Sequence, residues 1–274
     1  MDKNGSRGSS GIVTGASRGL GQLLAVALAE RGMNLTLAAR SEAGLAETVA
    51  MVARHGVRAV PVRCDVTDKD DLRKLVDAAV DEFGPPDLLV NNAGIEVVAD
   101  YREMSLEEIE SVMVTNSISP MLLTRLVVPH MTKRGSGHIV NISSTAGKIG
   151  MPYFAAYASS KHSLVGFSWS LRQELKPLGV GVSVICPGFI DGTGMADEWV
   201  RKKRPGMAPK VSPEKVVKAV LNAIDKDRAD VVLGSGLTPV SDVFFALSPD
   251  FSSRVLRVSG LHDYFAAEAR SRPR

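Results

Sequence analysis

The sequence is poor in cysteine, in net charge and in long hydrophobic runs, and each shortage excludes a class of protein. Only Cys64 and Cys186 occur in 274 residues, which excludes a disulfide framework and predicts a reducing, cytoplasmic environment. A formal net charge of +3 is too small to mark a nucleic-acid-binding protein, so we expect no nucleic-acid partner. The five histidines show no paired spacing typical of metal ligands, so we expect no metal site.

The first ten residues are polar, and no apolar stretch of signal-peptide length follows them, so we expect no secretion signal. We see no run of about 18 apolar residues and expect no transmembrane segment. Hydrophobic residues make up 45% and charged residues 23% of the chain, which is typical of a folded globular protein. The length suits one large domain.

Short apolar runs alternate with helical patterns from one end of the chain to the other. Several runs are apolar throughout, which is typical of strands buried on both faces of a parallel sheet. We expect seven strands, at Gly11–Thr14, Leu35–Arg40, Arg58–Cys64, Asp87–Asn91, His138–Ser143, Gly181–Cys186 and Asp230–Leu233. Helical periodicity lies between them, at 20–28, 72–83, 105–113, 164–175 and 213–224.

Strand–helix alternation with short crossovers predicts an α/β fold with a doubly wound, parallel, seven-stranded sheet of the Rossmann type. We expect one domain over 1–274, with its ligand site at the carboxyl ends of the strands, where the winding reverses. Glycine and proline are frequent at about 194–212, where we expect a substrate lid. A variable C-terminal tail is expected at about 238–274.

A glycine-rich turn, Thr14–Gly21, follows the first strand and leads directly into a helix. Glycines permit a tight turn and a close approach of the backbone to a pyrophosphate. The helix N-terminus adds free N–H groups and a partial positive charge. A purely structural strand–helix turn is the alternative, because the spacing is not GxGxxG. The phosphate-binding residues we expect are Gly15, Ser17, Arg18, Gly19, Leu20 and Gly21.

The second and third strands end in polar residues that suit a nucleotide. A protein that prefers NAD usually has Asp or Glu after the second strand. Here Arg40 and Ser41 follow it, and together with Arg18 they can bind a 2′-phosphate that a carboxylate would repel. We therefore expect NADP(H) rather than NAD, unless both arginines are plain surface residues. Asp65, followed by Val66, can accept a hydrogen bond from an adenine amino group or serve as a turn residue.

Tyr157 and Lys161 are spaced i, i+4 at the start of a helix and so share a face. Tyrosine has a pKa of about 10. A cation about 4 Å away in a partly buried site stabilises the phenolate by about 4 kcal/mol. That is about three pKa units and brings the proton near neutral pH, where acid–base catalysis works best. The pair alone also arises by chance in many proteins.

Two further polar residues lie near this pair in the sequence or in the expected fold. Ser144, thirteen residues before Tyr157, ends a buried strand and can donate a hydrogen bond to a substrate carbonyl. Asn116 occupies an apolar-stripe position of a helical pattern. A buried asparagine needs partners, and holding a water beside Lys161 would supply one.

Taken in order, these motifs resemble the short-chain dehydrogenase/reductase superfamily in its non-extended branch. TGASRGLG is similar to the family's TGxxxGxG, Asn91–Gly94 to its NNAG and Pro187-Gly188 to its PG. The resemblance covers about residues 8–195. The positions of the family's catalytic tetrad are held by Asn116, Ser144, Tyr157 and Lys161.

The resemblance implies an oxidoreductase that interconverts a carbonyl and a secondary alcohol by hydride transfer with NADP(H), acting on a small-molecule substrate. Tyr157 would be the general acid in reduction and the base in oxidation. Lys161 would lower the pKa of Tyr157 and hold the nicotinamide ribose. Ser144 would orient the carbonyl, and Asn116 would support a proton-relay water. Family members are usually homodimers or homotetramers.

The resemblance also implies the rest of the cofactor site. The family often has Thr five residues after the proline of PG, but here Gly192 stands there and Thr193 comes next. We expect Thr193 to reach the carboxamide through a one-residue insertion. The other cofactor-lining residues implied are Asn92, Ala93, Gly94, Pro187, Gly188 and Ile190.

The substrate end of the site is predicted from nearness in sequence to the catalytic residues. Four of the eight phenylalanines fall in the C-terminal tail, at Phe244, Phe245, Phe251 and Phe265. This tail either packs on its own domain or a partner subunit, or forms an apolar mouth for a lipid-like substrate or a peripheral membrane contact.

From nearness in sequence to the catalytic residues, the substrate-pocket residues we expect are Glu96, Lys148, Phe154 and Phe189.

Two other functions stay open. A non-catalytic NADP-binding regulatory or scaffold protein is the first, although loss of a tetrad member would be its expected mark. A nucleotide-sugar epimerase or dehydratase of the extended branch is the second. The glycine spacing and a length that leaves no room for a separate substrate domain speak against it.

Overall fold

The structure is a computed structural model that describes residues 8–191, 210–234 and 248–271. Seven strands form one parallel sheet in the order β3-β2-β1-β4-β5-β6-β9. The strand order reverses between β1 and β4, so the predicted doubly wound sheet is confirmed. Its strands are β1 Ser10–Thr14, β2 Asn34–Ala39, β3 Ala59–Arg63, β4 Leu88–Asn91, β5 Gly137–Ile142, β6 Val180–Pro187 and β9 Asp230–Leu233. A separate parallel pair joins β7 Phe189–Ile190 to β8 Lys210–Val211.

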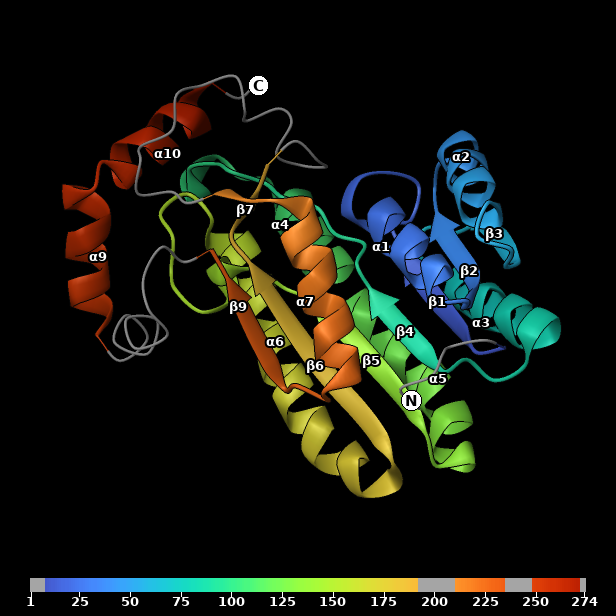
Figure 1. The fold of residues 1–274 in the computed structure, drawn as a ribbon. Helices are drawn as coiled ribbons and strands as arrows, with labels where there is room; N and C mark the ends of the chain where they lie inside the picture. The colour runs from blue at the N-terminus through green and yellow to red at the C-terminus, as the bar shows by residue number, and fades with distance from the viewer. Residues whose placement is uncertain (1–7, 192–209, 235–247, 272–274) are drawn as a thin grey trace.

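Helices cover both faces of the sheet (Figure 1). One apolar core lies between the sheet and α1, α2 and α7, and a second lies between the sheet and α3, α5 and α6. The helices are α1 Gly19–Glu30, α2 Glu42–Ala53, α3 Lys69–Phe83, α4 Leu106–Met113, α5 Ser119–Arg134, α6 Ala155–Leu175, α7 Pro213–Asp225, α9 Pro249–Val258 and α10 Leu261–Arg270. Short turns are η1 Tyr101–Glu103, the π turn η2 Val114–Ile118, η3 Thr145–Gly147 and η4 Lys176–Leu178.

Local sequence signals account for where several helices begin and end. A capping box starts α4: the Ser105 N–H donates to Glu108 Oε2 at 3.0 Å, and the Glu108 N–H donates to Ser105 Oγ at 3.1 Å. Both orphan amides of that helix end are thereby satisfied. Gly84, with φ of 78°, ends α3, because glycine adopts this conformation without steric cost.

One helical stretch, Leu106–Arg134, is long and apolar enough to cross a membrane by length and composition alone. The sequence, in contrast, predicts no transmembrane segment. Half of its most apolar window is buried inside the fold, where Leu123, Val127 and Met131 pack in the second core. A buried core helix satisfies the same criterion, so this stretch is weak evidence for a membrane span. The absence of a membrane segment stays a prediction.

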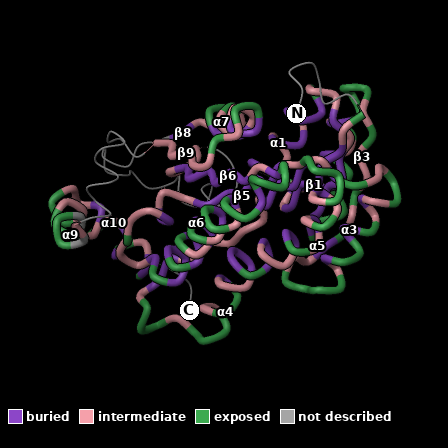
Figure 2. The backbone as a smooth tube through the Cα atoms, turned by 90° about the horizontal axis from the view of Figure 1, so that it is seen from below, coloured by how far each residue is buried: buried purple, intermediate pink, exposed green. Residues whose placement is uncertain are grey.

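The predicted lid and tail are only partly within the described residues. Residues 194–209 of the lid, and Phe244 and Phe245 of the tail, lie outside them. In the tail, α10 buries Phe265 completely, whereas α9 leaves Phe251 46% exposed. Figure 2 shows α9 at the edge of the molecule, with much of its surface exposed.

Candidate active site

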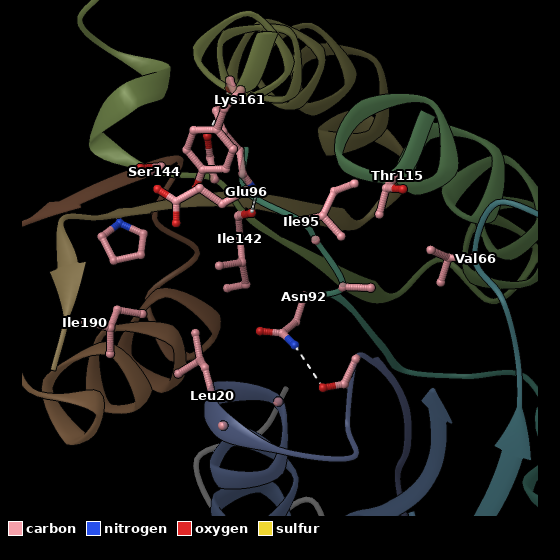
Figure 3. A pocket seen from close by; sticks show the side chains of 18 of the residues that line it. Leu20, Val66, Asn92, Ile95, Glu96, Thr115, Ile142, Ser144, Lys161 and Ile190 are labelled. Carbon is pink, nitrogen blue, oxygen red and sulfur yellow. Dashed lines mark hydrogen bonds between the residues drawn. The ribbon is translucent and has the colours of Figure 1, made fainter. Parts of the chain in front are cut away.

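A pocket of about 730 Å³ opens at the carboxyl ends of the strands, at the point where the strand order reverses, as the sequence predicts. Its walls come from the turns that follow β1, β2, β3, β4, β5 and β6 and from the start of α6 (Figure 3). Thr193 lies outside the described residues. The predicted cofactor residues that line the pocket are Gly15, Ser17, Arg18, Gly19, Leu20, Gly21, Arg40, Ser41, Asp65, Val66, Asn92, Ala93, Gly94, Pro187, Gly188 and Ile190.

The glycine turn is packed so closely that side chains are excluded. A Cβ on Gly21 would lie 2.2 Å from the carbonyl oxygen of Gly15, and Gly15 itself has a φ of 66°. Arg18 is the extended N-cap residue of α1, and no side chain among the described residues caps that helix end. The free N–H groups and the positive end of the helix dipole therefore suit the phosphates of a dinucleotide.

The far end of the pocket carries exposed cations. Arg18 and Arg40 both line it, and neither guanidinium has a hydrogen bond or ion pair with another described residue. Ser41 lies beside Arg40 and uses its hydroxyl to cap α2, accepting from the Gly44 N–H at 3.2 Å. Two unpaired guanidinium groups at one rim form a site suited to a phosphate.

Asp65 is a turn residue that also lines the pocket. Its Oδ1 accepts from the Thr67 N–H at 3.0 Å and from the Thr67 hydroxyl at 2.7 Å. These hydrogen bonds lower the pKa of the Asp65 carboxyl, and Arg40 lowers it further. Asp65 therefore serves as a turn residue, and its place in the pocket lining is compatible with accepting a hydrogen bond from an adenine amino group.

The NNAG segment joins the nucleotide half to the rest of the sheet. The Asn92 side chain donates to the carbonyl oxygen of Thr14 at 2.9 Å. The buried Asn91 side chain donates to Asn141 Oδ1 at 2.8 Å and to Thr124 Oγ1 at 3.1 Å. A Cβ on Gly94 would lie 3.1 Å from Asn116 Oδ1.

Tyr157 and Lys161 lie together in the first turns of α6, both almost completely buried. Lys161 Nζ donates to the carbonyl oxygen of Ile142 at 3.0 Å and lies 5.6 Å from the centre of the Tyr157 ring. Ser144, at the end of β5, hydrogen-bonds to Tyr157 and accepts from the Ala146 N–H at 3.1 Å. The structure thus brings these three predicted residues to one end of the pocket (Figure 3).

Burial controls the pKa values of this pair. It raises the pKa of Tyr157 well above its ordinary value; the Glu96 carboxylate adds to the increase, and the Ser144 hydrogen bond opposes it. Burial lowers the pKa of Lys161 to about 8, although Glu96 opposes this change. In the protein without a bound cofactor, the pKa of Tyr157 is therefore raised rather than brought near neutral pH, and the effect of Lys161 on it stays a prediction. Loss of hydration disfavours the charged forms of both groups.

Asn116 is fully buried in the π turn η2, behind the pocket wall. Its Oδ1 accepts from the Ile95 N–H, and its Nδ2 donates to the Ile95 carbonyl oxygen, both at 2.8 Å. Nδ2 also donates to Ser160 Oγ at 3.1 Å. Both amide hydrogens have protein partners, so Asn116 is satisfied in the fold, and its support of a proton-relay water stays a prediction. π turns of this kind occur often at functional sites.

Lys148 lies outside the pocket, so its prediction as a lining residue is wrong. Its ammonium forms an ion pair with Asp230 at the start of β9 and lies 4.2 Å from the centre of the Trp169 ring. Trp169 Nε1 also donates to Asp230, at 2.9 Å. An opposite charge and an aromatic face draw the lysine to the sheet edge, although it is close in sequence to Ser144.

Glu96, Phe154 and Phe189 line the pocket as predicted. Phe265 of α10 packs against two of them, with ring centres 4.9 Å from Phe154 and 6.0 Å from Phe189. This part of the tail therefore packs on its own domain, against two residues that line the pocket. The rest of the tail described here, α9, is largely exposed.

Several lining residues are missed by sequence reasoning, among them Ile95, Ser111, Thr115 and Met151. Ile95 directly follows NNAG and Thr115 directly precedes Asn116, so nearness to those motifs could have found them. Nothing in the sequence singles out Ser111 or Met151, which reach the pocket only through the fold. No group of three or more metal-ligating side chains gathers within the described ranges.

A parallel α/β sheet with a glycine turn, a cationic rim and Tyr157, Lys161 and Ser144 together at one end of the pocket is typical of a nucleotide-dependent oxidoreductase. The family model described as short chain dehydrogenase matches residues 11–204, and the chain belongs to this family. It is an oxidoreductase that acts on keto or hydroxyl groups.

Named relatives and solved structures agree with this assignment. The ketoacyl reductase HetN of Nostoc sp. is 38% identical over 97% of this chain and 94% of its own length. A 3-oxoacyl-[acyl-carrier-protein] reductase of Synechocystis sp. is 38% identical over 65% of this chain and 73% of its own. A crystal structure of a variant actinorhodin polyketide ketoreductase with NADPH has a TM-score of 0.77 and 32% identity, covering 84% of this chain and 98% of that one.

Proposed function

We propose that this protein is an NADPH-dependent reductase of 3-oxoacyl compounds in which Tyr157 donates the proton. The observation that carries the proposal is the buried Tyr157, hydrogen-bonded to Ser144 beside Lys161, at the opposite end of one pocket from Arg18 and Arg40. The names of the ketoacyl reductase relatives support the substrate class.

The residues fit a dinucleotide. The glycine turn leaves no room for a Cβ at Gly21, and the first amides of α1 have no side-chain cap. The phosphates would lie against this turn, and Arg18 and Arg40 would bind a 2′-phosphate. When bound, NADPH supplies the hydride that the protein cannot.

The raised pKa of Tyr157 keeps the proton on Oη at neutral pH, the state that a general acid requires for carbonyl reduction. Ser144 holds the phenol by a hydrogen bond and can donate to the same carbonyl oxygen. Lys161, with its pKa near 8, still carries most of its charge at pH 7 and stabilises the phenolate as it forms. The apolar wall of Ile95, Met151 and Phe154 excludes water from the reacting groups.

The test is NADPH oxidation by purified protein with aldehydes, diketones, steroids and 3-oxoacyl thioesters. We expect turnover of the thioesters, and a loss of at least about 100-fold in kcat for Tyr157→Phe, as acid–base catalysis contributes. Tyr153→Phe is the matched control, since Tyr153 lies just before α6, four residues from Tyr157, but does not line the pocket. It should keep full activity.

A non-catalytic NADP-binding protein is the competing function. It would bind NADPH with no turnover of any carbonyl compound, and Tyr157→Phe would change nothing. Cytoplasmic localisation and a homodimer or homotetramer stay predictions. Cell fractionation and light scattering of the full chain test them.

A further inference from the structure

The segment that joins β5 to α6 lines the pocket at two places. Residues 144–146 line it just after β5, and Met151 lines it near the start of α6. Between these places, Lys148 lies outside the pocket and pairs with a residue at the sheet edge. Ser144, which hydrogen-bonds to Tyr157, belongs to this segment, so the way the segment is held decides where the Ser144 hydroxyl lies.

Most hydrogen bonds of this segment are local. The Gly147 N–H donates to the carbonyl oxygen of Ser144 at 2.8 Å. The Lys148 N–H donates to the carbonyl oxygen of Thr145 at 2.9 Å. Among the described residues, the Lys148 side chain makes the one hydrogen bond or ion pair that joins residues 145–152 to a distant part of the chain. It is therefore the polar anchor of the segment.

The partner of this anchor belongs to β9, the strand at one edge of the sheet. Asp230 Oδ2 accepts from Lys148 Nζ and also from Trp169 Nε1, the latter at 2.9 Å. The Lys148 ammonium lies 4.2 Å from the centre of the Trp169 ring. Asp230 itself is in register with Val184 of β6, so the ion pair ties the pocket segment to the sheet.

Both charges of the pair are largely shielded from water, because the two side chains are 15% and 24% exposed. Asp230 Oδ1 is buried and has no hydrogen-bond partner among the described residues. Loss of Lys148 would leave this carboxylate with the neutral Trp169 donor in place of a cation, and an unpaired shielded charge is strongly unfavourable. Water can reach the carboxylate if the segment that carries residue 148 moves away from the sheet.

We propose that Lys148 is a positioning residue whose ion pair with Asp230 holds residues 144–152 so that Ser144 meets the substrate carbonyl. The proposal rests on the reductase function proposed above. Lys148 acts through Ser144, since it does not line the pocket. The nucleotide end of the pocket is built from other segments, so NADPH binding does not depend on this anchor.

The first test is steady-state kinetics with NADPH and a 3-oxoacyl thioester. Lys148→Met should lower kcat on the order of tenfold, because a misplacement of about 1 Å at the reacting groups is costly. The KM for NADPH should stay within about twofold of the wild-type value. Lys148→Arg keeps a cation beside Asp230 and should retain most of the activity. Asp230→Asn should cause a loss similar to that of Lys148→Met, and the double variant should lose no more than either, because each change removes the same bond.

Arg31→Met is the matched control, because it also removes one cation from an ion pair, with Asp225, outside the pocket lining. It should leave kcat unchanged. A purely structural role for Lys148 would give the same result as this control. The proposal is overturned if Lys148→Met leaves kcat per NADPH-binding molecule unchanged, whatever its effect on the urea midpoint of unfolding.

Hydrogen exchange separates this proposal from the proposed function, because it needs no turnover. Mass spectrometry of the full chain should show severalfold faster exchange of the amides of residues 145–152 in Lys148→Met, and no change there in Arg31→Met. If exchange responds in this way but the wild type reduces no ketone, the reductase function fails and the anchoring by Lys148 stands. If ketones are reduced but neither exchange nor kcat responds to residue 148, the anchoring fails alone.

Discussion

The side chain of Asn116 pairs with the backbone of Ile95 in both directions, accepting from its N–H and donating to its carbonyl oxygen at 2.8 Å. The pair ties the π turn η2 to the segment that follows β4. A residue usually considered for its catalytic role is thereby also a structural bond between two walls of the pocket. Its removal has consequences for folding that can be measured without any substrate.

Replacing Asn116 by Ala should lower the free energy of unfolding by about 3 kcal/mol, because it leaves two backbone groups of Ile95 without partners. Urea unfolding of the full chain measures this. Ser117→Ala is the control: Ser117 is buried in the same turn and bonds to Ser163, so its loss should cost about 1 kcal/mol. Equal effects of the two substitutions would contradict the role given to the Asn116–Ile95 pair.

Lys161→Met should change how stability depends on pH. The pKa of Lys161 is about 8 in the folded chain, against 10.5 as its ordinary value. Between these values the unfolded chain binds the extra proton, so the lysine's contribution to stability rises with pH through this window and is least favourable below pH 8. The shift corresponds to about 3 kcal/mol.

We therefore expect Lys161→Met to gain stability relative to wild type at pH 7 and to lose that advantage between pH 8 and 10.5, while reductase activity disappears. Chemical unfolding at pH 7, 8.5 and 10 measures the difference directly. A difference that is constant over this range would show that burial does not depress the pKa of Lys161.

Arg40→Asp should move the cofactor preference from NADPH toward NADH. A carboxylate repels the 2′-phosphate and can hold ribose hydroxyls instead, so the ratio of kcat/KM values should fall on the order of 100-fold. Arg63→Asp provides the control, since Arg63 lies on β3, pairs with Glu42 and does not line the pocket. The prediction fails if both variants keep the wild-type ratio.

Two glycines in helices should respond to alanine in opposite ways. A Cβ on Gly21 in α1 would lie 2.2 Å from Gly15 O, whereas a Cβ on Gly166 in α6 meets nothing within 4 Å. Gly21→Ala should weaken NADPH binding strongly, because the phosphate turn must open. Gly166→Ala should stabilise the chain by about 1 kcal/mol through helix propensity. Fluorescence titration with NADPH and thermal unfolding distinguish these effects.

The sequence predicts features that depend on residues close together along the chain. The seven strands, the Ser105–Glu108 capping box and the glycine turn are of this kind. The placement of Lys148 depends on Asp230, which lies 82 residues away, and no local pattern reveals that pairing. The pKa of Tyr157 could not be predicted either, because the i, i+4 spacing shows the nearby lysine but not the loss of hydration around both groups.

The contact between Phe265 and Phe154 has a consequence for how such a chain can diversify. Residues 15–66 form much of the nucleotide end of the pocket, whereas two residues that line its other end, Phe154 and Phe189, pack against α10 near the C-terminus. The cofactor preference and the shape of the substrate end therefore depend on separate stretches of the sequence. Exchange of the final helix would therefore change the shape offered to the substrate while the cofactor site stays the same.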